Sequence, residues 1–305
     1  MDLHTTYLGL DLKNPLVASA SPISRTLDGI KRLEDSSTAA IVLPSLFEEH
    51  CQSGTAAVEG AFGPEAYLDL IRRAVGSTDI PIIASLNGIT DQGWTMYAKT
   101  IEEAGAAALE LNIYYIPADI ETTSADVEQR YIDVLRAVKE TVKIPVSMKL
   151  SPYFSAFGAM AKRVAEEGAD GLVLFNRFYQ PDIDLAKMAI LPTLDLSNAH
   201  EARLPLLWIA VLSRRVQASI AATTGVERAE QVIKYLLVGA DVVMTTSSLL
   251  RDGPQHMADL VRGLAQWMYD HDYAQLSRIR GALSHSQAAD PTAFVRANYV
   301  DTLKG

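Results

Sequence analysis

The stretch Glu167-Gly168-Ala169-Asp170-Gly171-Leu172-Val173-Leu174 ends a helix-period segment with a glycine and enters a short apolar run. Glycine readily adopts the left-handed conformation that ends a helix. An apolar run without alternation is typical of a strand buried on both faces of a parallel sheet. The pattern recurs as Ala104-Gly105-Ala106 before 107–111 and as Val238-Gly239-Ala240-Asp241 before 242–244. The repeat therefore predicts helix–strand units that build a parallel sheet.

The same alternation of helical segments and apolar runs, followed in both directions along the chain, predicts eight strands separated by helices. The apolar stripes of helices fall in 68–75, 126–142, 231–237 and 257–268. Eight strand–helix pairs predict a (β/α)₈ TIM barrel, formed by residues 1–305 as a single domain with a short C-terminal helical extension from about residue 273. A doubly wound open sheet is the alternative, and the number of repeats favours the barrel. The predicted strands are 15–20, 39–44, 81–86, 107–112, 145–150, 171–176, 217–222 and 241–246.

The composition narrows the class of protein. The 305 residues include 27 basic and 37 acidic side chains, which gives a net charge of −10, and 49% are hydrophobic. An acidic chain repels phosphate backbones, so we expect no nucleic-acid partner. There is no apolar run of about 18 residues and no signal-peptide pattern, so we expect no membrane partner. With Cys51 as the single cysteine, an intrachain disulfide is impossible, and we expect a cytoplasmic protein.

Ligands of such barrels lie at the C-terminal ends of the strands, where the sequence places Lys149. A lysine at the end of a buried strand requires an anionic partner or a shifted pKa. It could be a cation held over an electron-rich ligand or a Schiff-base nucleophile. The alternative is a lysine that extends to the solvent at the barrel rim.

The last two strands are followed by small and hydroxyl residues, Thr223-Thr224-Gly225 and Thr246-Ser247-Ser248. Each run is expected to open a helix and to direct N–H and hydroxyl groups at one anion, in the usual phosphate position of a barrel. Ordinary helix capping by Thr and Ser would produce the same pattern.

The sequence shows no pattern typical of a metal site, a thiol pair or the common catalytic and nucleotide-binding motifs. The six histidines show no paired spacing, so no metal site is predicted. Cys51 has no nearby second cysteine, and we expect a buried or incidental thiol. The chain contains no G-x-S-x-G, P-loop or G-x-G-x-x-G motif.

The fourth and fifth strands carry a family resemblance. Glu110-Leu111-Asn112, followed by Met148-Lys149-Leu150-Ser151-Pro152-Tyr153-Phe154, resembles the FMN barrel of class 1 dihydroorotate dehydrogenases. The opening strand, Asn14-Pro15-Leu16-Val17-Ala18-Ser19-Ala20-Ser21, is similar to theirs as well. The stretches 42–49, 110–115 and 174–182 look like those of a dihydroorotate dehydrogenase-like subgroup, and the resemblance covers nearly the whole chain.

The resemblance implies FMN as cofactor, bound across the strand ends, with Lys149 beside the polar edge of the flavin. A small-molecule substrate and a homodimer are implied as well. The expected substrate-binding residues are Asn87, Asn112, Asn176 and Arg177. The expected cofactor-binding residues are Ala20, Ser21, Ser45, Asn112, Lys149, Thr223, Thr224, Gly225, Thr246 and Ser247.

The sequence also departs from that family. Tyr115 stands where class 1 enzymes have the cysteine that removes a proton from dihydroorotate, and Pro44 replaces a lysine. Thr224 replaces the first glycine of the phosphate pair, and Thr246-Ser247 replaces Gly-Thr. A phenol has a pKa of about 10 and is a poor base near neutral pH. We therefore expect weak or absent dihydroorotate oxidation, which disfavours an ordinary pyrimidine-pathway enzyme.

These features predict an FMN-dependent oxidoreductase that transfers hydride to or from flavin N5 and acts on CH–CH bonds, with Lys149 and Tyr115 as candidate catalytic residues. Tyr115 could donate a proton to an activated C=C bond, or it could simply fill a pocket left by a lost substrate. Two other classes stay open: a non-catalytic flavin-binding or scaffold protein, and an aldolase-like barrel that uses Lys149 as a Schiff base.

Overall fold

The computed structural model describes residues 1–50, 62–88, 91–177, 180–191 and 195–295, together with 299 and 303. Cys51, the predicted incidental thiol, lies outside the described residues. Among the helices that are described, none combines the length and the hydrophobicity needed to cross a bilayer.

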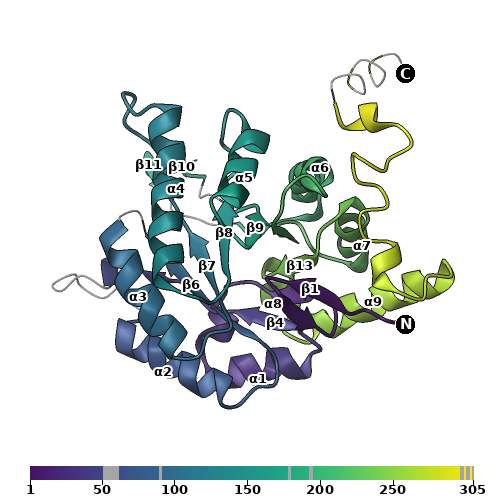
Figure 1. Cartoon of the computed structure of the whole chain (residues 1–305), viewed down its shortest axis with the longest axis horizontal. Coiled ribbons are helices and arrows are strands. Elements are labelled where there is room, and N and C mark those ends of the chain that lie inside the picture. The colour runs from purple at the N-terminus through teal and green to yellow at the C-terminus, as the bar shows by residue number, and fades with distance from the viewer. Residues whose placement is uncertain are drawn as a thin grey trace.

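Eight parallel strands close into a barrel (Figure 1). β13 pairs with β3 through Met244 and Val17, and β4 pairs with β6 through Val42 and Ile83, so that each barrel strand has two neighbours. The predicted (β/α)₈ TIM barrel is therefore confirmed, and the open doubly wound sheet is excluded. The barrel strands are β3 (Leu16–Ala18), β4 (Ala40–Val42), β6 (Ile82–Asn87), β7 (Ala108–Asn112), β8 (Val146–Leu150), β9 (Gly171–Leu174), β12 (Ser219–Ala222) and β13 (Val242–Thr245).

Helices cover the outside of the barrel (Figure 1). In α4, buried Tyr131, Leu135 and Val138 recur at helical spacing, and this stripe faces the core. The α-helices are α1 (Leu27–Asp35), α2 (Pro64–Val75), α3 (Asp91–Glu103), α4 (Ser124–Thr141), α5 (Phe157–Glu166), α6 (Arg203–Leu212), α7 (Ala229–Val238), α8 (Ser247–Asp252) and α9 (His256–Asp270). The 3₁₀ helices are η1 (Pro22–Arg25), η2 (Glu48–His50), η3 (Ala199–Ala202), η4 (Leu276–Arg278) and η5 (Pro291–Phe294).

The structure explains the Gly-Ala-Asp repeat. Gly168 and Gly239 have φ values of +100° and +115°, which lets the chain leave each helix sharply. Asp170 then accepts a hydrogen bond from the Val146 N–H at 2.8 Å. In the same way, Asp241 accepts one from the Ile220 N–H at 2.7 Å. Each aspartate thus ties the start of its own strand to the start of the neighbouring one.

An N-terminal hairpin closes the bottom of the barrel. Its strands, β1 (Thr5–Tyr7) and β2 (Leu10–Leu12), are antiparallel. Tyr7 and Leu8 are buried in the cluster that fills the barrel interior, and the Leu8 N–H donates to Ser219 Oγ at 3.2 Å. The hairpin thus occupies the N-terminal end of the barrel, and the C-terminal ends of the strands form the opposite, open end.

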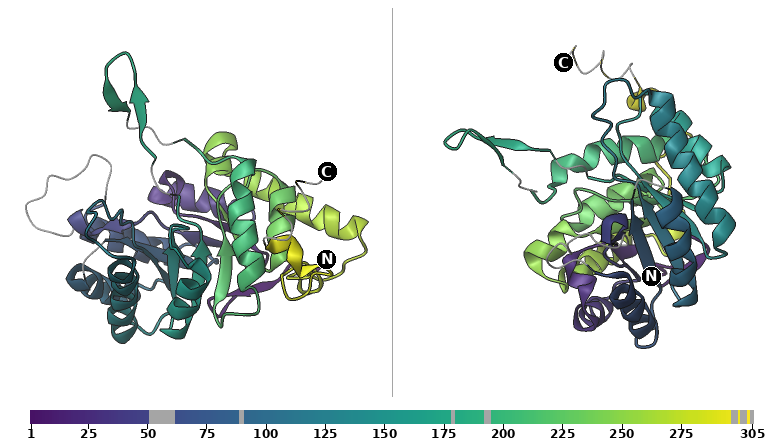
Figure 2. Two further views of the ribbon diagram at one scale, coloured as in Figure 1. Left: turned by 90° about the horizontal axis from the view of Figure 1, so that it is seen from above. Right: turned by 90° about the vertical axis from the view of Figure 1, so that its left-hand side faces the viewer.

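Three further strands lie outside the barrel positions. β5 (Leu46–Phe47) pairs with the end of β6, and β10 (Asp182–Asp184) pairs with β11 (Ala189–Leu191) as an antiparallel hairpin. This hairpin projects away from the barrel (Figure 2). The helix–strand repeat does not predict these strands, because they lie in the loops that follow barrel strands and not at the end of a helix.

The tail beyond residue 273 was expected to be a helical extension, and the structure shows the 3₁₀ helices η4 and η5 in it. Leu276 and Ile279 are buried against the rest of the chain. The N–H groups of Gly281 and Leu283 donate to carbonyls of α7 at 2.9 and 2.8 Å. Glycine at position 281, with φ of +73°, interrupts any longer helix here.

Candidate functional site

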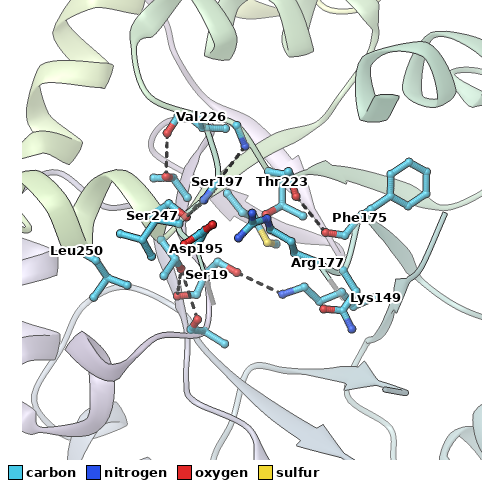
Figure 3. A pocket seen from close by; sticks show the side chains of 18 of the residues that line it. Ser19, Lys149, Phe175, Arg177, Asp195, Ser197, Thr223, Val226, Ser247 and Leu250 are labelled. Atoms are coloured by element: carbon cyan, nitrogen blue, oxygen red, sulfur yellow. Dashed lines mark hydrogen bonds between the residues drawn. The ribbon is translucent and has the colours of Figure 1, made fainter. Parts of the chain in front are cut away.

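A cavity of about 350 Å³ opens at the C-terminal ends of β3, β8, β9, β12 and β13 (Figure 3). It lies at the end of the barrel opposite the N-terminal hairpin. The residues that line it are Ser19, Ala20, Pro22, Lys149, Phe175, Asn176, Arg177, Asp195, Leu196, Ser197, Thr223, Thr224, Gly225, Val226, Met244, Thr245, Thr246, Ser247 and Leu250.

The structure brings most of the predicted site residues to this one cavity. Asn112 lies beside it, because the Asn176 side-chain amide donates to Asn112 Oδ1 at 2.5 Å. Besides Asn112, four predicted residues do not line it: Ser21, Ser45, Asn87 and Tyr115. The predicted residues that do line it are Ala20, Lys149, Asn176, Arg177, Thr223, Thr224, Gly225, Thr246 and Ser247.

Three of the predicted residues outside the lining make local contacts. Ser21 Oγ accepts a hydrogen bond from the Ile23 N–H at the start of η1. Ser45 Oγ lies 2.8 Å from Ser85 Oγ. Asn87, at the end of β6, is in register with Asn112 on β7.

Lys149 is a positively charged residue in the lining of the cavity. Its side chain is only 11% exposed, and Nζ lies 3.4 Å from Ser19 Oγ (Figure 3). Nζ also lies 3.5 Å from Glu110 Oε1. Lys149 therefore does not extend to the solvent, and the barrel supplies the anionic partner that a buried lysine requires. Arg177 lies at the same cavity but is engaged by Glu201, with contacts of 3.0 and 3.1 Å.

Hydroxyl and backbone groups gather at the opposite end of the cavity. Ser247 opens α8 as expected, but the run Thr223-Thr224-Gly225 does not open a helix, because α7 begins only at Ala229. Thr224 and Gly225 have φ values of +81° and +72°. Two consecutive left-handed residues turn the chain tightly, and the intervening segment carries it to α7.

Ser197 is central to this end of the cavity and was not predicted. The Gly225 N–H donates to Ser197 Oγ at 3.2 Å, and the Ser197 N–H donates to Ser247 Oγ at 3.1 Å. The Arg251 guanidinium donates two bonds of 3.0 Å to the Ser197 carbonyl. A ligand anion here would share these donors with Ser197. No sequence motif marks Ser197, which lies far from its partners along the chain.

Tyr235 is a second residue at this end of the cavity that was not predicted. Its hydroxyl, on α7, donates to the Thr224 carbonyl at 2.7 Å and lies 3.4 Å from the Thr223 carbonyl. Burial raises the pKa of Tyr235, so the phenol stays neutral and keeps its donor hydrogen. In the sequence it resembles any apolar-stripe residue of a helix.

Tyr115 lies in a second cavity of about 300 Å³. Arg130 Cζ stands 4.1 Å above the centre of the Tyr115 ring, an arrangement typical of a cation–π contact. The two cavities share no lining residue. The cavity is lined by Tyr115, Ile116, Pro117, Val127, Tyr131, Ser151, Tyr153, Phe154 and Gln180.

The donor set of the first cavity fits FMN. Lys149 offers an ammonium at one end, and Thr223 and Ser247 offer hydroxyls at the other, with the apolar Ala20 and Met244 also in the lining. The Thr246 hydroxyl donates to the Ser19 carbonyl at 3.1 Å and would have to exchange this bond for one to a phosphate. A flavin ring needs a flat, mostly apolar slot, and its phosphate needs hydroxyl and N–H donors. Across the described part of the chain, no group of three or more His, Cys, Asp or Glu side chains could hold a metal ion.

The fold and site thus define a parallel α/β barrel with a cavity at the strand ends, lined by the cations Lys149 and Arg177, the carboxylate of Asp195 and several hydroxyl groups. Comparison with known proteins gives the family: the dihydroorotate dehydrogenase family profile matches residues 59–268, and the chain belongs to this family.

Three curated relatives illustrate its range. The NAD(+)-dependent dihydroorotate dehydrogenase B catalytic subunit of Methanothermobacter thermautotrophicus is 24% identical over 305 residues, covering 93% of this chain and 98% of the relative. The corresponding subunit of Anoxybacillus flavithermus is 32% identical, covering 63% and 64%. The NAD-dependent dihydropyrimidine dehydrogenase subunit PreA of Escherichia coli K12 is 23% identical, covering 93% and 77%.

Proposed function

We propose that this protein is an FMN-dependent oxidoreductase that acts on CH–CH bonds and oxidises dihydroorotate weakly or not at all. The observation that carries the proposal is the cavity itself, in which Lys149 lies at one end and the Thr/Ser/Gly loops of β12 and β13 at the other. When bound, FMN would supply hydride exchange at N5. Family membership supports the flavin, and the missing cysteine supports the loss of dihydroorotate oxidation.

Each end of the cavity has its own part in this proposal. The Lys149 ammonium would favour negative charge on the polar edge of the flavin, because opposite charges attract strongly in a poorly solvated site. The hydroxyls of Thr223, Thr246 and Ser247, with the Gly225 N–H, would bind the phosphate. Asn112 and Asn176, already hydrogen-bonded to each other, would orient polar groups of the substrate.

The colour of the purified protein tests the proposal. We expect a yellow protein whose flavin is released on denaturation and identified as FMN. The aldolase alternative instead predicts a colourless protein in which borohydride traps a carbonyl substrate on Lys149. A non-catalytic flavin protein would be yellow but would show no turnover with any of a panel of unsaturated acceptors.

Tyr115 provides a second test. The Tyr115 ring lies under Arg130 and outside the lining of the Lys149 cavity, although a third cavity adjoins both through Tyr153 and Asn176. This position favours the pocket-filling interpretation over that of a proton donor. We therefore expect Tyr115→Phe to reoxidise its reduced flavin with unsaturated acceptors within about twofold of the parent rate, whereas loss of a true general acid would cost about 10²-fold or more. Anaerobic stopped-flow absorbance measures this rate. A large decrease in the rate would show that Tyr115 acts as a proton donor.

Replacement of Tyr235 by phenylalanine tests the coupling of α7 to the phosphate end. Tyr235→Phe leaves the buried Thr224 carbonyl without its donor, and we expect the free energy of unfolding to fall by about 1–2 kcal/mol and the Kd for FMN to rise. Tyr131→Phe is the matched control, because its buried hydroxyl donates to the Ile113 carbonyl at 3.1 Å on another side of the barrel. Urea unfolding should show a similar loss in the free energy of unfolding for both variants. FMN titration should show a raised Kd only for Tyr235→Phe. Equal FMN affinities would contradict the coupling.

We also propose a cytoplasmic homodimer. The family resemblance suggests two copies, and the β10–β11 hairpin supplies a surface for them. Ile183 and Ile190 lie directly opposite each other in the hairpin and are 62% and 71% exposed. Exposed apolar pairs of this kind are typical of association surfaces. Sedimentation equilibrium should give twice the chain mass, and Ile183→Lys should lower it to that of one chain.

A further inference from the structure

A buried carboxylate lies beneath the cavity and has no role in the proposed function. Glu110, on β7, is 1% exposed. Neither of its carboxylate oxygens accepts a hydrogen bond from any residue that the structure describes. A buried carboxylate normally accepts hydrogen bonds from several donors, so an alternative source of stabilisation is required.

That source is Lys149 on the neighbouring strand. Asn112 and Lys149 are paired in the β7–β8 register, so Glu110 and Lys149 come from adjacent strand ends. Lys149 Nζ lies 3.5 Å from Glu110 Oε1, and within the described ranges this is the ion pair that Glu110 forms. The same ammonium lines the cavity. Lys149 is therefore held between a carboxylate inside the barrel and the ligand space above it.

The Tyr7 phenol and the Ser147 hydroxyl are neighbours of Glu110 in the barrel interior. Burial raises the pKa of Tyr7, the negative charge of Glu110 and, more weakly, that of Asp241 raise it further, and the Ser147 hydroxyl opposes this rise. Tyr7 and Ser147 are themselves buried. Since both of these neighbours are neutral, the charge that balances Glu110 is the Lys149 ammonium.

We propose that Glu110 is a positioning residue for Lys149: its carboxylate fixes the ammonium at the cavity floor and partly offsets the positive charge that a ligand in the cavity meets. The consequence for flavin rests on the proposed function. A reduced, anionic flavin beside Lys149 would be stabilised less than by an unpaired lysine, because Glu110 repels it through the poorly solvated barrel.

The pairing is tested first in the full chain without any ligand. Lys149→Met leaves Glu110 buried without a counter-ion, and we expect the unfolding equilibrium constant to rise about 10²- to 10³-fold. Adding Glu110→Gln removes the buried charge and should restore most of that loss in urea unfolding. If Lys149→Met is too unstable to purify, recovery of soluble protein on adding Glu110→Gln would equally support the pairing. Additive losses, or no recovery, would overturn the proposal.

Asp241→Asn is the matched control for this cycle. It removes a carboxylate that is paired with Arg280 at 2.7 Å, near the beginning of β13 and outside the cavity. Its effect should add to that of Lys149→Met, because Asp241 is paired with Arg280 and Lys149 with Glu110, so the two substitutions break different ion pairs. A rescue by Asp241→Asn equal to that by Glu110→Gln would show a general charge effect and overturn the specific pairing.

The flavin consequence is tested by the two-electron reduction potential of bound FMN. Glu110→Gln should raise it, with the ratio of reduced to oxidised flavin at a fixed potential increasing about tenfold, or about 30 mV. An unchanged or lowered potential would overturn the charge-offsetting role. If the parent protein binds no flavin, the proposed function fails, while the stability cycle still decides whether Glu110 positions Lys149.

Discussion

Dihydroorotate is expected to reduce the bound flavin about 10²- to 10⁴-fold more slowly than in a family member that has the cysteine base. The physical reason is twofold. A phenol accepts a proton poorly near neutral pH, and Tyr115 faces a cavity that shares no lining residue with that of Lys149. Anaerobic stopped-flow mixing of the oxidised protein with dihydroorotate measures the rate.

The variant Tyr115→Cys separates these two reasons. If only the chemistry of the side chain were missing, a thiol at position 115 would restore flavin reduction by about 10²-fold or more. Because Arg130 and the aromatic cavity surround this position, we expect less than about tenfold recovery. Full recovery would show that residue 115 reaches the substrate. Tight orotate binding, measured by calorimetry, would separately contradict a lost substrate site.

Gly225→Ala is expected to be among the most damaging single substitutions at the site. At the Gly225 φ of +72°, any side chain is strained, and a Cβ would lie 2.7 Å from the Ala202 nitrogen and 2.8 Å from the Asn198 oxygen. Both contacts are with backbone atoms, which cannot move away as easily as the end of a flexible side chain. Strain of about 1–2 kcal/mol and overpacking of about 1–3 kcal/mol together predict a loss of about 3 kcal/mol in the free energy of unfolding.

Gly9→Ala is the natural control for that substitution. Gly9 has almost the same φ, +74°, but a Cβ there meets no atom within 4 Å. Its loss should therefore reflect backbone strain alone, about 1–2 kcal/mol, and FMN binding should be unchanged. Urea unfolding of both variants gives the steric contribution by difference. Equal losses would mean that the η3 segment moves aside freely and that the site is not tightly packed.

The barrel could be predicted from the sequence because its signals are local. Glycine at 168 and 239 ends a helix through its own backbone freedom, and the aspartates that follow sit at a fixed distance from the next strand. Parallel strands in a closed barrel all end on one face, so Lys149, Asn176 and Thr223 could be assigned to one site without knowing any distance. The short strands β5, β10 and β11 lack such a periodic signal.

The partners of those residues were decided only by the tertiary structure. Ser197 binds Ser247 across 50 positions, Tyr235 supports the Thr224 carbonyl, and Lys149 meets Glu110 from the next strand. Tyr115, placed at the base position by its distance from Asn112 along the chain, lies under Arg130. Periodicity determines which element a residue belongs to and which end of it faces the site. Hydrogen bonds and charge pairing depend on where loops from distant elements meet, and that depends on packing throughout the barrel.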